Sequence, residues 1–108
     1  MKYALLAYNP AAADQRGPIM PAIAEALERS KVKSWVRLQH GESATTVSSP
    51  DGKTLLTDGP FVDSKEYLGG VIVIEAENLD EALAFATELQ GLMRGGGALE
   101  VRPILEDR

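Results

Sequence analysis

Hydrophobic and polar positions follow two different periods along this chain, one typical of strands and one of helices. Residues 2–8 form an almost continuous apolar run that ends at Asn9-Pro10, and residues 71–76 form a second one. Such runs are typical of central strands that are covered on both faces. Residues 32–39 alternate in character at every second position, and residues 99–104 do the same. This period predicts two further strands, the last ending near an edge because it contains a proline.

Between these strands the sequence predicts a hairpin. Residues 44–47 and 54–57 are rich in threonine and aliphatic residues, and the intervening segment 48–53 contains Pro50 and the pair Asp51-Gly52. Proline and Asp-Gly are strong turn formers, so we expect the two runs to pair across this turn.

Two segments have the helical period. The first has Pro18 and Pro21 near its start and is expected to end between Ser30 and Lys33. Its apolar face is predicted to contain Ile19 or Met20, Ile23, Ala26 and Leu27. The second is expected to begin after Asn78, with Glu81 completing a capping box, and to end at the glycines 95–97. Its predicted apolar face is Leu79, Ala82, Leu83, Ala86, Leu89 and Met93.

The order of these elements predicts an α+β fold in one domain, residues 1–108. We expect a ferredoxin-like split βαβ sheet with both helices on one face. The other face would then carry Tyr3 or Tyr8, Trp35, and one side each of the strands 71–76 and 99–104. Because so apolar a face is poorly suited to water, the sequence predicts a homodimer that packs face to face.

Composition narrows the possible partners. Hydrophobic residues are 44% and charged residues 25% of the 108 residues, as in soluble globular proteins. The formal net charge of -5 would repel the phosphate backbone, so no nucleic-acid partner is expected. The chain has no cysteine, which fits a cytoplasmic location. The N-terminal apolar run is too short for a signal peptide, and no apolar run is long enough to span a bilayer, so no membrane association is expected.

The segment from Thr57 to Gly70 combines acidic, basic, aromatic and turn-forming residues without a regular period. One interpretation is a cleft wall in which the carboxylate of Asp58 accepts a proton. A cation such as Lys65 and burial against Phe61 would then tune the proton affinity of this carboxylate. The alternative is structural: Asp58 forms an Asx turn, Pro60 restricts the backbone and Phe61 fills the core.

Two other residues are candidates for chemistry. His40 is the only histidine and therefore the natural general base, although its position also fits an exposed strand end. Arg102 could bind an anionic ligand, or form an ion pair with Glu100. With one histidine and no cysteine we predict no metal site and no cofactor. The glycines 95–97 follow a helix, so they do not form a phosphate-binding loop.

The segment Thr57-Asp58-Gly59-Pro60-Phe61, with Lys65-Glu66 and Leu68-Gly69-Gly70 after it, resembles the signature of DGPF-domain proteins. These are a branch of the YCII-related superfamily. Residues 1–6, 44–47 and 100–103 agree with the same family in place and order, so the resemblance spans nearly the whole chain.

This resemblance implies a bacterial protein whose ferredoxin-like subunit dimerises as an α/β barrel, often encoded beside extracytoplasmic-function sigma factors. In the wider group a His and Asp pair in a cleft is suspected of catalysis, with the histidine near the start of the first helix. Residues 16–21 contain no histidine here. Only Asp58 matches the signature, and His40 would be a substitute at a different place.

Three hypotheses follow. The first is a homodimer that binds a small molecule in a cleft between helices, sheet and the loop 58–66, with Asp58 and His40 for proton transfer and Phe61, Lys65, Trp35 and Arg102 for binding. The second is a non-enzymatic regulatory or sensory module that binds a sigma factor. The third is a cofactor-free monooxygenase in which Trp35 and His40 line one apolar pocket.

Overall fold

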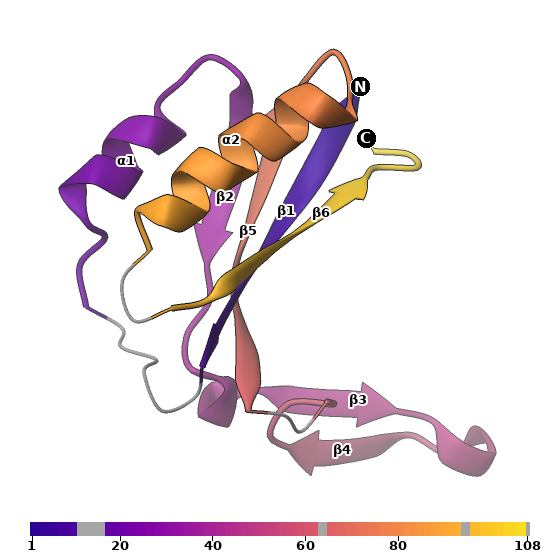
Figure 1. Ribbon diagram of the computed structural model, residues 1–108. Helices are drawn as coiled ribbons and strands as arrows, with labels where there is room; N and C mark the ends of the chain where they lie inside the picture. The colour runs from indigo at the N-terminus through magenta and orange to yellow at the C-terminus, as the bar shows by residue number, and fades with distance from the viewer. Residues whose placement is uncertain (11–16, 63–64, 94–95, 108) are drawn as a thin grey trace.

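Two helices cover one face of a four-stranded sheet, and a two-stranded hairpin projects from one end of it (Figure 1). The computed structural model describes residues 1–10, 17–62, 65–93 and 96–107. The elements in chain order are β1 (Lys2–Pro10), α1 (Pro21–Leu27), β2 (Val32–Arg37), the 3-10 helix η2 (Gly41–Ser43), β3 (Thr45–Ser48), the 3-10 helix η3 (Pro50–Gly52), β4 (Leu55–Asp58), β5 (Glu66–Glu75), α2 (Leu79–Gly91) and β6 (Ala98–Pro103).

The strands of the main sheet lie in the order β2-β5-β1-β6, and all neighbours are antiparallel. β1 and β5 are the central strands, as their apolar runs predict, and β6 is an edge strand. One helix connects β1 to β2 and the other connects β5 to β6. This arrangement is the ferredoxin-like split βαβ fold, so the predicted fold class is confirmed.

The core lies between the sheet and the two helices. Its buried residues are Tyr3, Leu5, Ala26, Leu27, Ile72, Ile74, Ala76, Ala82, Phe85, Ala86 and Leu89. The predicted face of α2 is partly wrong, because Leu79 and Leu83 are 47% and 42% exposed, whereas Phe85 is 2% exposed. The helix is therefore rotated so that its aromatic residue, and not Leu83, meets the sheet.

The helix ends show why the local predictions succeeded or failed. Asn78 caps α2, since its side chain accepts a 2.9 Å hydrogen bond from the backbone N–H of Glu81. Glu81 in turn accepts from the backbone N–H of Glu77, one residue before the position expected in a capping box. α1 begins at Pro21, one of the two prolines expected near its start, so Ile19 and Met20 precede it, and it ends earlier than predicted, at Leu27. Backbone hydrogen bonds between residues three positions apart tighten the last turn and continue to the start of β2.

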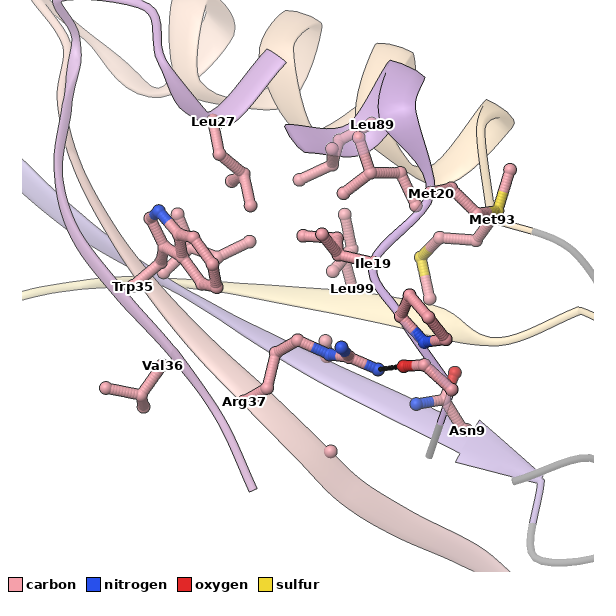
Figure 2. Close-up of a pocket in the computed structure, with 17 residues that line it drawn as sticks. Asn9, Ile19, Met20, Leu27, Trp35, Val36, Arg37, Leu89, Met93 and Leu99 are labelled. Atoms are coloured by element: carbon pink, nitrogen blue, oxygen red, sulfur yellow. Dashed lines mark hydrogen bonds between the residues drawn. The ribbon is translucent and has the colours of Figure 1, made fainter. Parts of the chain in front are cut away.

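One extra residue in β2 exchanges the two faces of the sheet on which the following side chains lie. Its pairing with β5 shifts by one position just after Val32, which leaves Lys33 as a bulge. Beyond the bulge Trp35 pairs with the core residue Ile72, and its side chain points toward the helices (Figure 2). The predicted strict alternation is therefore wrong, because Val32 packs against the core whereas Val36 faces the opposite side.

The predicted hairpin is confirmed. β3 pairs with β4, and the turn between them contains Asp51 and Gly52, both with positive φ angles. Only glycine and, less often, Asp or Asn adopt this backbone without strain, which explains the Asp-Gly pair. The hairpin extends away from the main sheet (Figure 1), and Val47 and Leu56, which pair across it, are 67% and 66% exposed.

The second face of the main sheet is not covered by either described helix (Figure 1). Leu6 and Val71 pair on this open face and are half-buried, and Val36 is 54% exposed. Of the alternatives Tyr3 or Tyr8 for this face, Tyr3 is excluded because it is in the core. Trp35, also predicted for this face, is on the helix side because of the bulge. Within the described residues, no helix is long and apolar enough to cross a membrane.

Candidate functional site

A cavity of about 360 Å³ lies between the helices and the sheet. We call it the helix-side cavity. Its apolar wall is made by residues from five segments that are distant in sequence: Ile19, Leu27, Trp35, Ile72, Leu89 and Leu99. Figure 2 shows Ile19, Leu27, Leu89 and Leu99 around one space, with Trp35 on one side and Met20 and Met93 on the other. Preformed cavities of roughly 300–1,000 Å³ with mostly apolar walls are typical ligand sites.

One end of this cavity is polar. Arg37 follows Trp35 by two residues in β2, so both side chains lie on the helix side of the sheet (Figure 2). Its Nη2 donates a 2.9 Å hydrogen bond to the backbone carbonyl of Gly17. Asn9, at the end of β1, lines the same end. Arg37 forms no ion pair with any residue that the structure describes, so its positive charge is available to a ligand.

A second cavity, of about 580 Å³, lies beside the segment that follows β4. We call it the loop-side cavity. Its walls include Tyr8, His40, Pro60, Phe61 and Tyr67. The cleft expected between helices, sheet and loop is therefore divided into two cavities, and the loop contributes to only one of them.

His40 has a structural role at the entrance of η2. Its Nδ1 accepts a hydrogen bond of 3.1 Å from the backbone N–H of Glu42, which makes His40 the N-cap of this short helix. Its ring also meets the ring of Tyr67 edge-on. Gly41 lies so close to Tyr67 that an added Cβ would be 3.2 Å from the aromatic ring. These contacts attach the turn after β2 to the start of β5.

The structure separates the other predicted site residues. Asp58 is exposed at the end of β4, where it pairs with Thr45, and it lines neither cavity. Lys65 is also exposed and lines neither cavity. Phe61 lines the loop-side cavity and is 81% exposed, so it does not fill the core as the structural alternative required. Asp63, an acidic residue of the segment from Thr57 to Gly70, lies outside the described residues.

Arg102 lies on the edge strand β6 and donates a 2.5 Å hydrogen bond from Nε to Glu100. This hydrogen bond and the charge of Glu100 raise the pKa of Arg102. The predicted ion pair is therefore present, and Arg102 lines neither cavity. Trp35 lines the helix-side cavity and His40 the loop-side cavity, so the single apolar pocket expected for a monooxygenase is not formed by these two residues.

Arg37 and Asn9 were not predicted as site residues. A signal was present for Arg37, because it follows Trp35 by two positions in a strand and must therefore share its face. No group of three or more His, Asp or Glu side chains converges among the described residues. The absence of a metal site and of a cofactor stays a prediction from the sequence.

The comparison with known families agrees with this fold. Residues 1–107 match the YCII-related domain. The chain belongs to this family. An uncharacterised protein of Rhizobium meliloti (strain 1021) is similar to this YCII-related domain, with 38% identity over 78 residues. The aligned part covers 72% of the chain and 63% of the relative, so the chain spans less than two thirds of that protein's length. The predicted YCII-related resemblance is confirmed.

Proposed function

We propose that this YCII-related domain binds a small molecule in the helix-side cavity. The observation that carries the proposal is the cavity itself, about 360 Å³ of space between two packed layers with a largely apolar wall. The cavity is partly open to solvent, so a small molecule can enter it and bury apolar surface against its wall. The sheet supplies about half of its lining residues and is a rigid element suited to hold a ligand in one orientation, and residues between Gly17 and Leu27 supply most of the opposite wall.

Trp35 supplies a direct test, because it is the only tryptophan of the chain and lines the cavity. A metabolite library is screened by thermal shift, and each hit is titrated while tryptophan emission is recorded. We expect a hit to raise the melting temperature and to change the emission of Trp35, since a ligand that binds only the native state stabilises it.

A matched pair of variants on β1 localises the binding. Ala7 faces the helix-side cavity, whereas Ala4 lies on the opposite face of the same strand. Ala7→Leu fills part of the cavity and should abolish binding, and Ala4→Leu should leave it unchanged. Far-UV circular dichroism confirms that both variants fold. Equal binding by the Ala7→Leu variant and the native protein would show that the ligand occupies another place.

The loop-side cavity is a second candidate site, favoured by the fact that His40 and Phe61 both line it. Acid/base catalysis by Asp58 and His40 belongs to this second proposal. It is tested by repeating the screen on Asp58→Asn and His40→Ala. Loss of a thermal shift in His40→Ala, with the Trp35 emission unchanged, supports a ligand in the loop-side cavity, whereas loss in Asp58→Asn alone would place the ligand outside both cavities. Hits that are unchanged in both variants remove these two residues from the site.

The non-enzymatic alternative is a regulatory or sensory module that binds an extracytoplasmic-function sigma factor. It is supported by the exposed apolar residues of the projecting hairpin, chiefly Val47 and Leu56. Co-elution of the purified protein with a candidate sigma factor in gel filtration, lost in Val47→Ser and retained in Ser49→Ala, would support it.

We also propose that two copies pair through the open face, where Leu6, Val36 and Val71 lie without a covering helix. Membership of the DGPF branch and a cytoplasmic location in a bacterium belong to the same proposal, and rest on the segment from Thr57 to Phe61 and on the absence of cysteine.

A further inference from the structure

Arg37 is the only charged side chain among the described residues that line the helix-side cavity. No carboxylate lines this cavity within the described part of the chain, although the protein carries 16 acidic residues and a net charge of -5. A guanidinium without an ion-pair partner among the described residues, next to an apolar wall, is therefore a local exception to the net negative charge of the molecule. Arg37 is exposed at the open end of the cavity, so an anion can reach its guanidinium directly from solvent.

The backbone around Arg37 leaves room for a ligand. Its direct partner in β5 is Gly70, which has no side chain to occupy the space beside the guanidinium. Among the described residues, the side chain of Arg37 forms one hydrogen bond, to the carbonyl of Gly17. A guanidinium has five N–H donors in a planar fork, so enough of them remain to bind the two oxygens of a carboxylate. Asn9 lines the same end and can add an amide donor.

The rest of the wall defines the other part of the ligand. Trp35, Ile72 and Leu89 form a surface that offers no charged group and is suited to an aromatic or branched aliphatic body. A phosphate group, which carries up to two charges, is usually bound by several cations or by a cluster of backbone N–H groups. Arg37 is the one cation at this wall among the described residues, which matches a single carboxylate better.

We propose that the helix-side cavity binds a monocarboxylate with an aromatic or branched apolar body, and that Arg37 anchors its carboxylate. This inference rests on the proposed binding of a small molecule in the same cavity. The apolar body lies against Trp35, and the carboxylate takes a bidentate hydrogen bond from Arg37. Arg37 is thus the residue that selects acids over neutral molecules of the same shape.

The test uses pairs of probes that differ only in charge: 3-phenylpropionate and 3-phenylpropionamide, and 4-methylpentanoate and 4-methylpentanamide. Binding to the native protein is measured at pH 7 by calorimetry and by Trp35 emission. We expect each acid to bind about tenfold more tightly than its amide, or more. Arg37→Gln should bind acid and amide equally. Arg37→Lys should retain only part of the preference, since lysine keeps the charge but loses the planar fork.

Arg102→Gln is the matched control, because Arg102 is also a strand arginine but lines neither cavity. It should leave the preference for acids unchanged, and thermal unfolding checks that all variants fold. Equal binding of acids and amides to the native protein, lost in Ala7→Leu, would overturn the role of Arg37 and leave the proposed function intact. Retention of the preference in Arg37→Gln would overturn it as well. If no probe and no library compound bound, both proposals would be wrong.

Discussion

The imidazole of His40 meets the ring of Tyr67 edge-on, with 4.9 Å between the ring centroids and an interplanar angle of 85°. This contact, together with the hydrogen bond from the backbone N–H of Glu42 to His40, joins the turn after β2 to the start of β5. A histidine that sequence reasoning treats as a general base is therefore also a stabilising residue.

Replacement of His40 by alanine should destabilise the protein. The change removes the cap of η2 and the ring contact with Tyr67, each worth about 1 kcal/mol. His40→Asn should recover part of the loss, because asparagine can cap the helix but makes no ring contact. The free energy of unfolding is measured in urea, with Gln39→Ala as the control. A His40→Ala variant as stable as the native protein would show that neither contact contributes.

Glu88 should make stability depend on pH. Arg29 donates from both terminal nitrogens to the two carboxylate oxygens of Glu88, and this hydrogen bonding lowers the pKa of Glu88 below its ordinary value. A carboxyl group with a lowered native pKa stabilises the fold above the unfolded-state pKa, and the contribution disappears as the pH falls through the native pKa. Glu88→Gln should thus lower the melting temperature at pH 7, by a small amount because the pair is exposed.

The difference in melting temperature between the native protein and Glu88→Gln should shrink toward zero as the pH is lowered below 4.5, the ordinary value for glutamate. Glu28→Gln, at an exposed glutamate that forms no ion pair with a described residue, should show no such trend. A constant difference between pH 7 and pH 3 would contradict the assigned role of the Arg29 pair.

Phe85 should be far more important for stability than Leu83, its neighbour on α2. Phe85 is 2% exposed, and the cations of Arg29 and Lys31 lie 5.7 and 5.5 Å from its ring centroid. Phe85→Ala should cost about 3–5 kcal/mol, since it removes a buried aromatic ring and leaves a cavity. Leu83→Ala should cost about 0.5 kcal/mol or less. The free energies of unfolding of both variants are measured in urea. Comparable losses would show that Phe85 and Leu83 do not differ in burial, and would contradict the orientation of α2 described above.

Gly70 should not tolerate a side chain. A Cβ at this position would lie 2.9 Å from the backbone carbonyl oxygen of Val36, which cannot move without disturbing the pairing of β2 and β5. Gly70→Ala should therefore destabilise the protein by about 1–3 kcal/mol. Gly17→Ala, where an added Cβ has no neighbour within 4 Å among the described atoms, should be close to neutral. Thermal unfolding of the two variants makes the comparison, and equal melting temperatures would refute the close contact.

Light scattering at micromolar concentration tests the proposed pairing through the open face. We expect the mass of two chains for the native protein and the mass of one chain for Val36→Lys, because a charge on this face opposes burial. Val47→Lys, on the projecting hairpin, should remain a dimer. The mass of one chain for the native protein would exclude the dimer at that concentration.

Features that depend on neighbours in sequence could be predicted from the residues alone. The cap at Asn78 and the Asp51-Gly52 turn are correct because each arises from the conformational preferences of a few adjacent residues. The split βαβ topology of the antiparallel sheet could also be predicted from the order of the elements, since few topologies accommodate this succession of strands and helices.

Only the tertiary structure decided on which face of the sheet a side chain lies after a bulge. It also decided which residues from distant parts of the sequence come into contact. One extra residue at Lys33 moved Trp35 from the open face to the helix side, because side chains in a strand alternate with a period of two.

The segment from Thr57 to Gly70 has the most distinctive composition in the chain. It lines the loop-side cavity with its aromatic part and reaches the helix-side cavity only with Gly69 and Gly70, and it leaves Asp58 exposed. The helix-side cavity is lined instead by Ile19, Arg37 and Leu99 from distant parts of the sequence, and no local pattern specifies how three such segments pack together.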